Sequence, residues 1–134
     1  MVNRDRLEKA NSRAALSEVV PLKAPYVVFI DPCGACNLSC AFCPCNTADF
    51  MNAERHKMMD SKLFNKIVDD LMQFEEPVKV INLYGFGEPL LNRNIAEMVR
   101  VLKEKRVCRE IRITTNGLLL TEQLSRELVE AGVD

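Results

Sequence analysis

The stretch YVVFIDPCGACNLSCAFCPC, residues 26–45, joins an apolar run directly to a cluster of cysteines. Residues 26–31 are β-branched or aromatic up to Asp31 and lie between Pro25 and Pro32, which predicts a strand buried on both faces. Five of the six cysteines in the chain follow within thirteen positions. The sequence therefore predicts a strand that runs straight into a ligand-holding loop.

Three of these cysteines, Cys36, Cys40 and Cys43, have the spacing C-x3-C-x2-C, so their thiolates can converge on one inorganic centre. The N-terminal residues lack the apolar core of a secretory signal, and clustered cysteines without such a signal are usually metal ligands rather than disulfides. Zinc is one alternative, because Cys33 and Cys36 form one C-x2-C pair and Cys40 and Cys43 another. The order does not match the C-x2-C-x2-C-x3-C-P run of a ferredoxin.

The same order of strand, loop and helix occurs three times along the chain. Strands are expected at residues 26–31, 78–84 and 110–114. A helix with apolar residues at 3.6-residue spacing follows each strand and its loop. The expected caps of these helices are Asp60, Asn92 or Asn94, and Thr121, with Gly132 as the last stop. This alternation predicts a parallel sheet with crossover helices, and a loose or solvated leader at residues 1–24.

Unusual residues follow all three expected strands. The cysteine loop comes after the first strand, residues 85–89 (GFGEP) come after the second, and residues 115–117 (TNG) come after the third. Because the carboxyl ends of parallel strands share one edge, these motifs are expected to form one site. Glu88 is placed there to face the ammonium of a bound amino acid; the alternative is a solvated glutamate in a tight turn.

The pattern C-x3-C-x-aromatic-C, with Phe42 as the aromatic residue, resembles the mark of the radical S-adenosylmethionine enzymes. The resemblance implies that Cys36, Cys40 and Cys43 hold three irons of a [4Fe–4S] cluster, and that S-adenosylmethionine chelates the fourth iron. It also implies the fold, which is the N-terminal half, three βα units, of a partial TIM-type (β/α)6 barrel. On this basis residues 25–134 are the core domain, truncated at the start of its fourth strand.

Two further motifs extend the resemblance. Residues 85–89 are similar to the glycine-rich G-G-E-P motif that binds the methionyl amino group, although Phe86 stands where the family usually has a glycine. Residues 115–117 are similar to a T-N-G found near the methionyl moiety or the substrate. The cofactor-binding residues implied in this way are Phe42, Gly85, Gly87, Glu88, Pro89, Thr115 and Asn116.

The chemistry implied by the resemblance starts with one electron from a reduced flavodoxin or ferredoxin. Cleavage of S-adenosylmethionine then gives methionine and a 5′-deoxyadenosyl radical, which abstracts hydrogen from a small-molecule or peptide substrate. The stretch is most similar to members that carry an extra cluster-binding C-terminal domain. Two alternatives stay open: a zinc-stabilised module without catalysis, and an electron carrier that uses Cys33 or Cys45 as a fourth ligand. Cys108 is expected before the third strand, as a buried spare thiol at the opposite end of the sheet.

The composition of the chain limits the partners and the compartment that we expect for it. A net charge of −1 gives no electrostatic reason to expect nucleic acid. No apolar run approaches the roughly 20 residues that span a bilayer, and six thiols without an export signal predict a reducing cytoplasm. With the third strand as an open edge, the 134-residue chain is expected to be poorly soluble or oligomeric, and unable to cleave S-adenosylmethionine at a useful rate.

Overall fold

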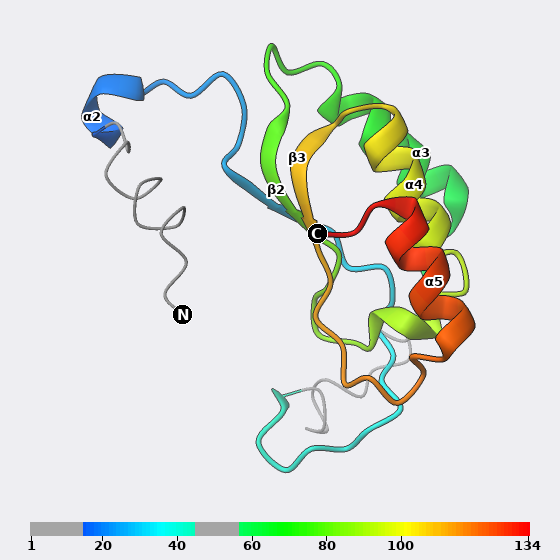
Figure 1. Cartoon of the computed structure of the whole chain (residues 1–134). Helices are drawn as coiled ribbons and strands as arrows, with labels where there is room; N and C mark the ends of the chain where they lie inside the picture. The colour runs from blue at the N-terminus through cyan, green and yellow to red at the C-terminus, as the bar shows by residue number, and fades with distance from the viewer. Residues whose placement is uncertain (1–14, 45–56) are drawn as a thin grey trace, which may run out of the picture.

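Figure 1 shows the computed structural model of the chain, which describes residues 15–44 and 57–134. The expected alternation of strands and helices is present. The elements are α2 (Leu16–Val19), β1 (Val27–Phe29), α3 (Ser61–Leu71), β2 (Val78–Asn82), the 3-10 helix η3 (Pro89–Leu91), α4 (Ile95–Glu104), β3 (Cys108–Arg112) and α5 (Glu122–Ala131).

The three strands form one parallel sheet in the order β1-β2-β3. Its central row pairs Val28 with Ile81, and Ile81 with Ile111. Helices α3, α4 and α5 all lie along the same side of this sheet, whereas α2 lies away from them (Figure 1). The predicted parallel α/β arrangement is confirmed. It is the arrangement of three consecutive βα units of a partial barrel.

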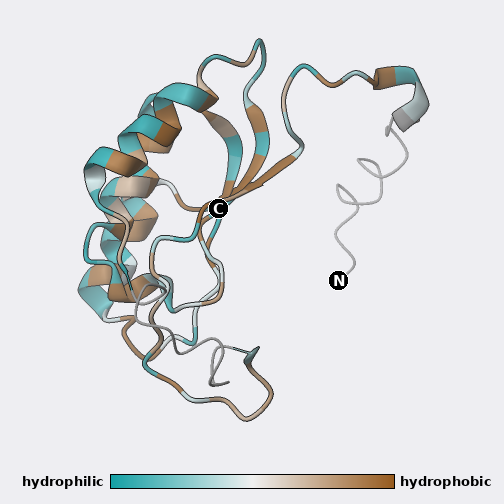
Figure 2. Ribbon diagram, turned by 180° about the vertical axis from the view of Figure 1, so that it is seen from behind, coloured by the Kyte–Doolittle hydropathy of each residue, from teal (hydrophilic) through white to brown (hydrophobic). Residues whose placement is uncertain are grey.

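The core lies between the sheet and the three helices. Ile81 and Ile111 point from the sheet into this layer and are fully buried. The helices contribute their apolar faces, so the brown bands of Figure 2 turn toward the strands. Each large side chain buried in this way contributes about 1.5–3 kcal/mol to folding. The helix residues buried in the core are Phe64, Val68, Ile95, Ala96, Met98, Val99, Leu102, Leu128 and Ala131.

Within the described residues, no helix packs against the opposite face of the sheet. Val27 and Phe29 of β1 lie on it, and the Phe29 side chain is 64% exposed. The ring of Phe29 meets the ring of Tyr84 edge-on, with 5.7 Å between the ring centroids. The prediction that residues 26–31 form a strand buried on both faces is therefore wrong, because helices pack against one face of β1 only.

Local signals predicted the cap residues of all three helices, and two of these caps make a side-chain bond to their helix. The Asp60 carboxylate accepts the Leu63 N–H at 2.7 Å, and the Thr121 hydroxyl accepts the Leu124 N–H at 3.1 Å. Gly132 ends α5 in the left-handed conformation, with φ of 93°. The middle helix differs, because its cap residue Asn94 makes no side-chain bond to the helix. The third strand also begins earlier than predicted, with Cys108 inside it.

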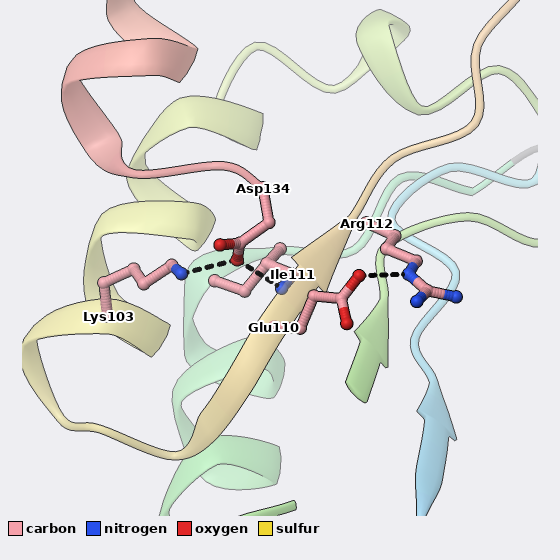
Figure 3. A network of polar contacts seen from close by, with 5 residues as sticks. All are labelled: Lys103, Glu110, Ile111, Arg112 and Asp134. Carbon is pink, nitrogen blue, oxygen red and sulfur yellow. Dashed lines mark hydrogen bonds and ion pairs between the residues drawn. The ribbon is translucent and has the colours of Figure 1, made fainter. Parts of the chain in front are cut away.

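The outer edge of β3 makes its backbone bonds to Asp134 (Figure 3). The backbone N–H of Asp134 donates to the Ile111 carbonyl at 3.1 Å, and the Asp134 carboxylate accepts the Ile111 N–H at 2.9 Å. Lys103 of α4 donates to the same carboxylate at 2.6 Å. One aspartate thus ties the edge of the sheet to the helix layer.

Candidate active site

The three motif loops meet at the carboxyl edge of the sheet, at the lower end of the strands in Figure 1. The first connection between them is made by Asp31, the residue that ends the β1 run. Its carboxylate accepts the Cys33 N–H at 3.2 Å and the Phe86 N–H at 3.1 Å. A Cβ atom on Gly85 would lie 2.2 Å from the Asp31 carboxylate. Gly85 is therefore needed because the Asp31 side chain occupies that space.

Gly87 makes the second connection. A Cβ atom at this position would lie 1.8 Å from the carbonyl oxygen of Cys33 and 2.6 Å from that of Ala35. The next residue, Glu88, donates its backbone N–H to the Ala35 carbonyl at 2.7 Å. The first half of the cysteine loop thus rests directly on the backbone of the GFGEP turn, an approach that only a glycine permits.

Cys33 belongs to this packed half of the loop. It is fully buried, and its thiol donates to the Ala35 carbonyl at 3.6 Å. Burial raises the pKa of the Cys33 thiol, and nearby carboxylates raise it further against the opposing effect of the Ala35 contact. Because the Cys33 side chain is fully buried and its sulfur is bonded to the Ala35 carbonyl, its position argues against Cys33 as the fourth ligand of an electron carrier. Cys45, the other candidate, lies outside the described residues.

The outer half of the loop carries the three motif cysteines. Cys36 is exposed, Cys40 and Cys43 are half-buried, and all three are free thiols. The Cys43 N–H donates to the Cys40 carbonyl at 3.0 Å, so these two residues share one tight turn, on which Phe42 is 92% exposed. Within residues 15–44 and 57–134, no three Cys, His, Asp or Glu side chains lie close enough to hold a metal ion. The donor set itself, three thiols on one exposed loop, suits an iron–sulfur cluster.

Glu88 joins the second motif to the third. Its side chain is only 2% exposed, so the alternative of a solvated glutamate is wrong. One carboxylate oxygen accepts the Leu90 N–H at 3.0 Å and the Thr115 hydroxyl at 2.5 Å. The other accepts the Asn116 N–H at 2.8 Å. The three donors satisfy the buried carboxylate, which thereby holds the two loops together. That it also faces a ligand ammonium stays a prediction.

The third motif reaches back to the cysteine loop through Asn116. Its side-chain NH2 group donates to the Asn37 amide oxygen at 2.8 Å and lies 4.0 Å from the Cys36 sulfur. Gly117 follows with φ of 77°, and its N–H donates to the Thr115 hydroxyl oxygen at 3.0 Å. The structure thus brings Cys36, Glu88, Thr115 and Asn116 together, as the common edge of the strands predicts.

Two structural anchors of the site were not predicted. Asn92, 2% exposed, donates its side-chain amide to the Pro32 carbonyl at 2.8 Å and to the Met59 carbonyl at 3.0 Å. It therefore fastens the two ends of the cysteine loop, whereas the sequence suggested only a helix cap. Its oxygen does accept the Asn94 N–H at 3.0 Å. Asp31 is the other anchor, and its position between a strand and Pro32 was the only available signal.

Cys108 lies apart from these loops. It is the first residue of β3, at the opposite end of the sheet, and it is buried. Burial raises the pKa of its thiol to about 11. The prediction of a buried thiol remote from the motif is confirmed, although Cys108 stands inside the strand and not before it.

Comparison with known proteins shows the family to which this chain belongs. The model of the radical SAM superfamily matches residues 30–134, which hold all three motifs. The chain belongs to the radical SAM superfamily. Members of this family bind a [4Fe–4S] cluster and S-adenosylmethionine, and the three-stranded parallel sheet is that of its barrel. No helix within the described residues is long and apolar enough to cross a membrane.

Two curated relatives show the range of the similarity. The chain is 36% identical over 107 residues to a tungsten-containing aldehyde ferredoxin oxidoreductase cofactor-modifying protein of Pyrococcus furiosus, covering 80% of this chain and 28% of that protein. It is 35% identical over 99 residues to a probable GTP 3′,8-cyclase of Methanococcus maripaludis, covering 74% and 31%. The chain thus spans about three tenths of the length of these relatives.

A solved structure resembles the fold. The crystal structure of BtrN in complex with AdoMet and 2-DOIA superposes with a TM-score of 0.65 at 25% identity. The match covers 81% of this chain and 43% of that one. The match therefore includes most of this chain and less than half of that structure.

Proposed function

We propose that residues 25–134 are core-domain sequence of a radical SAM enzyme that cleaves S-adenosylmethionine reductively to start hydrogen abstraction from a substrate. The observation that carries the proposal is the connection of all three motif loops at one edge of the sheet. Glu88 bonds to Thr115 and Asn116, and Asn116 bonds to Asn37 beside Cys36. A structural role of any single motif would not require the three to be joined.

In this proposal Cys36, Cys40 and Cys43 hold a [4Fe–4S] cluster as thiolates. They fit this role because they are free, accessible and carried by one loop whose base is fixed by Asn92 and Gly87. When bound, the cluster supplies the single low-potential electron that the family uses to cleave S-adenosylmethionine.

The remaining motif residues orient S-adenosylmethionine. Gly85 and Gly87 let Asp31 and the cysteine loop pack directly against the GFGEP turn, which fixes the turn beside the proposed ligand. Glu88 supplies a fixed negative charge behind the turn for the ligand ammonium, and Pro89 stiffens the start of η3. Thr115 and Asn116 add a hydroxyl and an amide on the other side. In this proposal Phe42, which is exposed on the cysteine loop, covers the bound cofactor.

Partners and substrate follow only from the family. We propose a reduced flavodoxin or ferredoxin as the electron donor and a small molecule or peptide as the substrate. Relatives named as GTP 3′,8-cyclases and a cofactor-modifying protein act on different molecules, so no single substrate class is favoured.

The proposal is tested by anaerobic reconstitution with iron and sulfide. We expect a brown protein whose electron paramagnetic resonance signal, after reduction, shifts when S-adenosylmethionine is added. Tight zinc binding without iron uptake would favour a zinc-stabilised module. A cluster whose electron paramagnetic resonance signal does not change when S-adenosylmethionine is added would favour an electron carrier. Either result would overturn the enzyme assignment.

A further inference from the structure

The side chain of Asn116 is held in one orientation by its neighbours. Its backbone N–H donates to the buried Glu88 carboxylate at 2.8 Å. Its amide oxygen accepts the Leu118 N–H at 3.0 Å. These two bonds use the backbone donor and the side-chain acceptor, and they leave the NH2 group directed away from its own loop.

The NH2 group of Asn116 faces the cysteine loop. An amide NH2 carries two donors, and two acceptors of that loop lie near it. They are the Asn37 oxygen at 2.8 Å and the Cys36 sulfur at 4.0 Å. These residues are 79 and 80 positions away in the chain, so only the fold brings them together.

Cys36 differs in this respect from the other motif cysteines. Within the described residues, the hydrogen bonds found for Cys40 and Cys43 are those of their own backbone turn. Among the motif cysteines, a side-chain donor from another described loop is found at the sulfur of Cys36. The donor, Asn116, is held through its backbone N–H by Glu88, and Leu90 and Thr115 bond to the same carboxylate. Its position is therefore set by the buried part of the protein.

We infer that Asn116 is a positioning residue that clamps the cysteine loop through Asn37 and donates a hydrogen bond to the Cys36 thiolate, which raises the reduction potential of the cluster held there. This inference rests on the proposed function, because it takes Cys36 as a cluster ligand. Hydrogen bonds to cluster sulfurs stabilise the reduced, more negative state, and thereby tune the potential. Asn116 would then act on the cluster through Cys36 and Asn37.

The test uses Asn116→Ala and Asn116→Asp, with Asn65→Ala on the exposed face of α3 as the control. Asn116→Asp keeps an acceptor for the Leu118 N–H but replaces the NH2 donor by a carboxylate oxygen. Two readouts are taken. Hydrogen exchange of backbone amides in residues 36–43 is measured on the metal-free, reduced chain. The midpoint potential of the reconstituted cluster is measured by a redox titration followed by electron paramagnetic resonance.

We expect the Cys43 amide, which is bonded to the Cys40 carbonyl, to exchange roughly fivefold faster in both Asn116 variants than in the wild type, as the loss of one net hydrogen bond implies. We also expect the midpoint potential to shift to more negative values in Asn116→Ala, and further in Asn116→Asp, while Asn65→Ala changes neither. Unchanged exchange and an unchanged potential, with the cluster intact, would overturn the inference.

The two proposals fail in different ways. A wild-type chain that takes up no iron would overturn the proposed function and the tuning of a potential, whereas the exchange measurement would still decide the clamp. A wild-type cluster that responds to S-adenosylmethionine, together with Asn116 variants of wild-type potential, would overturn the tuning alone.

Discussion

The carboxylate of Asp31 accepts a hydrogen bond from the backbone N–H of Phe86 at 3.1 Å, although the two residues lie 55 positions apart in the chain. Asp31 ends the run of the first strand, and Phe86 stands in the turn after the second. This contact sets the cysteine loop against the GFGEP turn before any cofactor is bound. The base of the site is therefore preorganised by the protein itself.

We expect Asp31→Ala to lower the free energy of unfolding by about 1–3 kcal/mol, because it leaves the N–H groups of Cys33 and Phe86 without their acceptor. Urea unfolding followed by circular dichroism measures this change. Asp69→Ala is the control, since its exposed ion pair with Lys105 contributes only about 0–1 kcal/mol. Equal losses in the two variants would show that Asp31 is no more than a surface carboxylate.

Two glycines of the site are expected to respond differently to alanine. In Gly87→Ala the new Cβ meets the backbone carbonyls of Cys33 and Ala35, so the cysteine loop must move. In Gly117→Ala the space is open and the cost is the left-handed conformation, about 1–2 kcal/mol. We expect Gly87→Ala to lose iron uptake and Gly117→Ala to keep it. Full iron content in Gly87→Ala would contradict the close approach of the two loops.

Glu88→Gln places an NH2 group among donors that now bond to a carboxylate. We expect a loss of about 1.5–3 kcal/mol in the stability of the metal-free chain, since hydrogen bonds to a charged group are lost. We also expect S-adenosylmethionine binding, measured by calorimetric titration, to weaken more than cluster assembly. Wild-type affinity in a folded variant would leave Glu88 a purely structural residue.

The ligand assignment is tested by alanine variants of the cysteines. Cys36→Ala, Cys40→Ala and Cys43→Ala are each expected to abolish the cluster. Cys108→Ala is the matched control, because Cys108 is buried at the far end of the sheet. Iron and sulfide per chain, measured after anaerobic reconstitution, decide the matter. If Cys108→Ala loses as much iron and sulfide as the other three variants, the ligand assignment is wrong.

The edge contact of Asp134 predicts a pH dependence. Burial, the largest single influence, raises the pKa of Asp134, but the hydrogen bonds from Lys103 and Ile111 and the charge of Lys103 together outweigh it and lower the pKa below 3.8. A lowered folded-state pKa adds stability that is present above the unfolded value and is lost as the pH falls through the folded one.

The corresponding variant is Lys103→Met, with the exposed Lys62→Met of α3 as the control. We expect Lys103→Met to be less stable than the wild type at pH 7, and the difference to shrink at pH values below the pKa of Asp134. Urea unfolding at both pH values measures it. A difference that is the same at both would mean that Lys103 acts through packing and not through the carboxylate.

Sequence alone determined the features that depend on near neighbours. The caps at Asp60 and Thr121 involve residues three positions apart, and the stop at Gly132 depends on its own backbone conformation. The order of strands and helices follows from short-range periodicity, and the cysteine spacing lies within one loop. Such signals can be read directly because the interacting groups are adjacent in the chain.

Only the tertiary structure decided what depends on distant contacts. Whether Phe29 is buried depends on what packs against β1, and a run of apolar residues cannot show that one face of the strand stays open. The sequence left open whether Glu88 is a solvated turn residue, and its contacts with Thr115 and Asn116 show that it is buried. Asn92 becomes the anchor of the cysteine loop through carbonyl groups 60 and 33 positions away. Burial and hydrogen bonding of these side chains are properties of the assembled sheet edge, which no single stretch of the sequence contains.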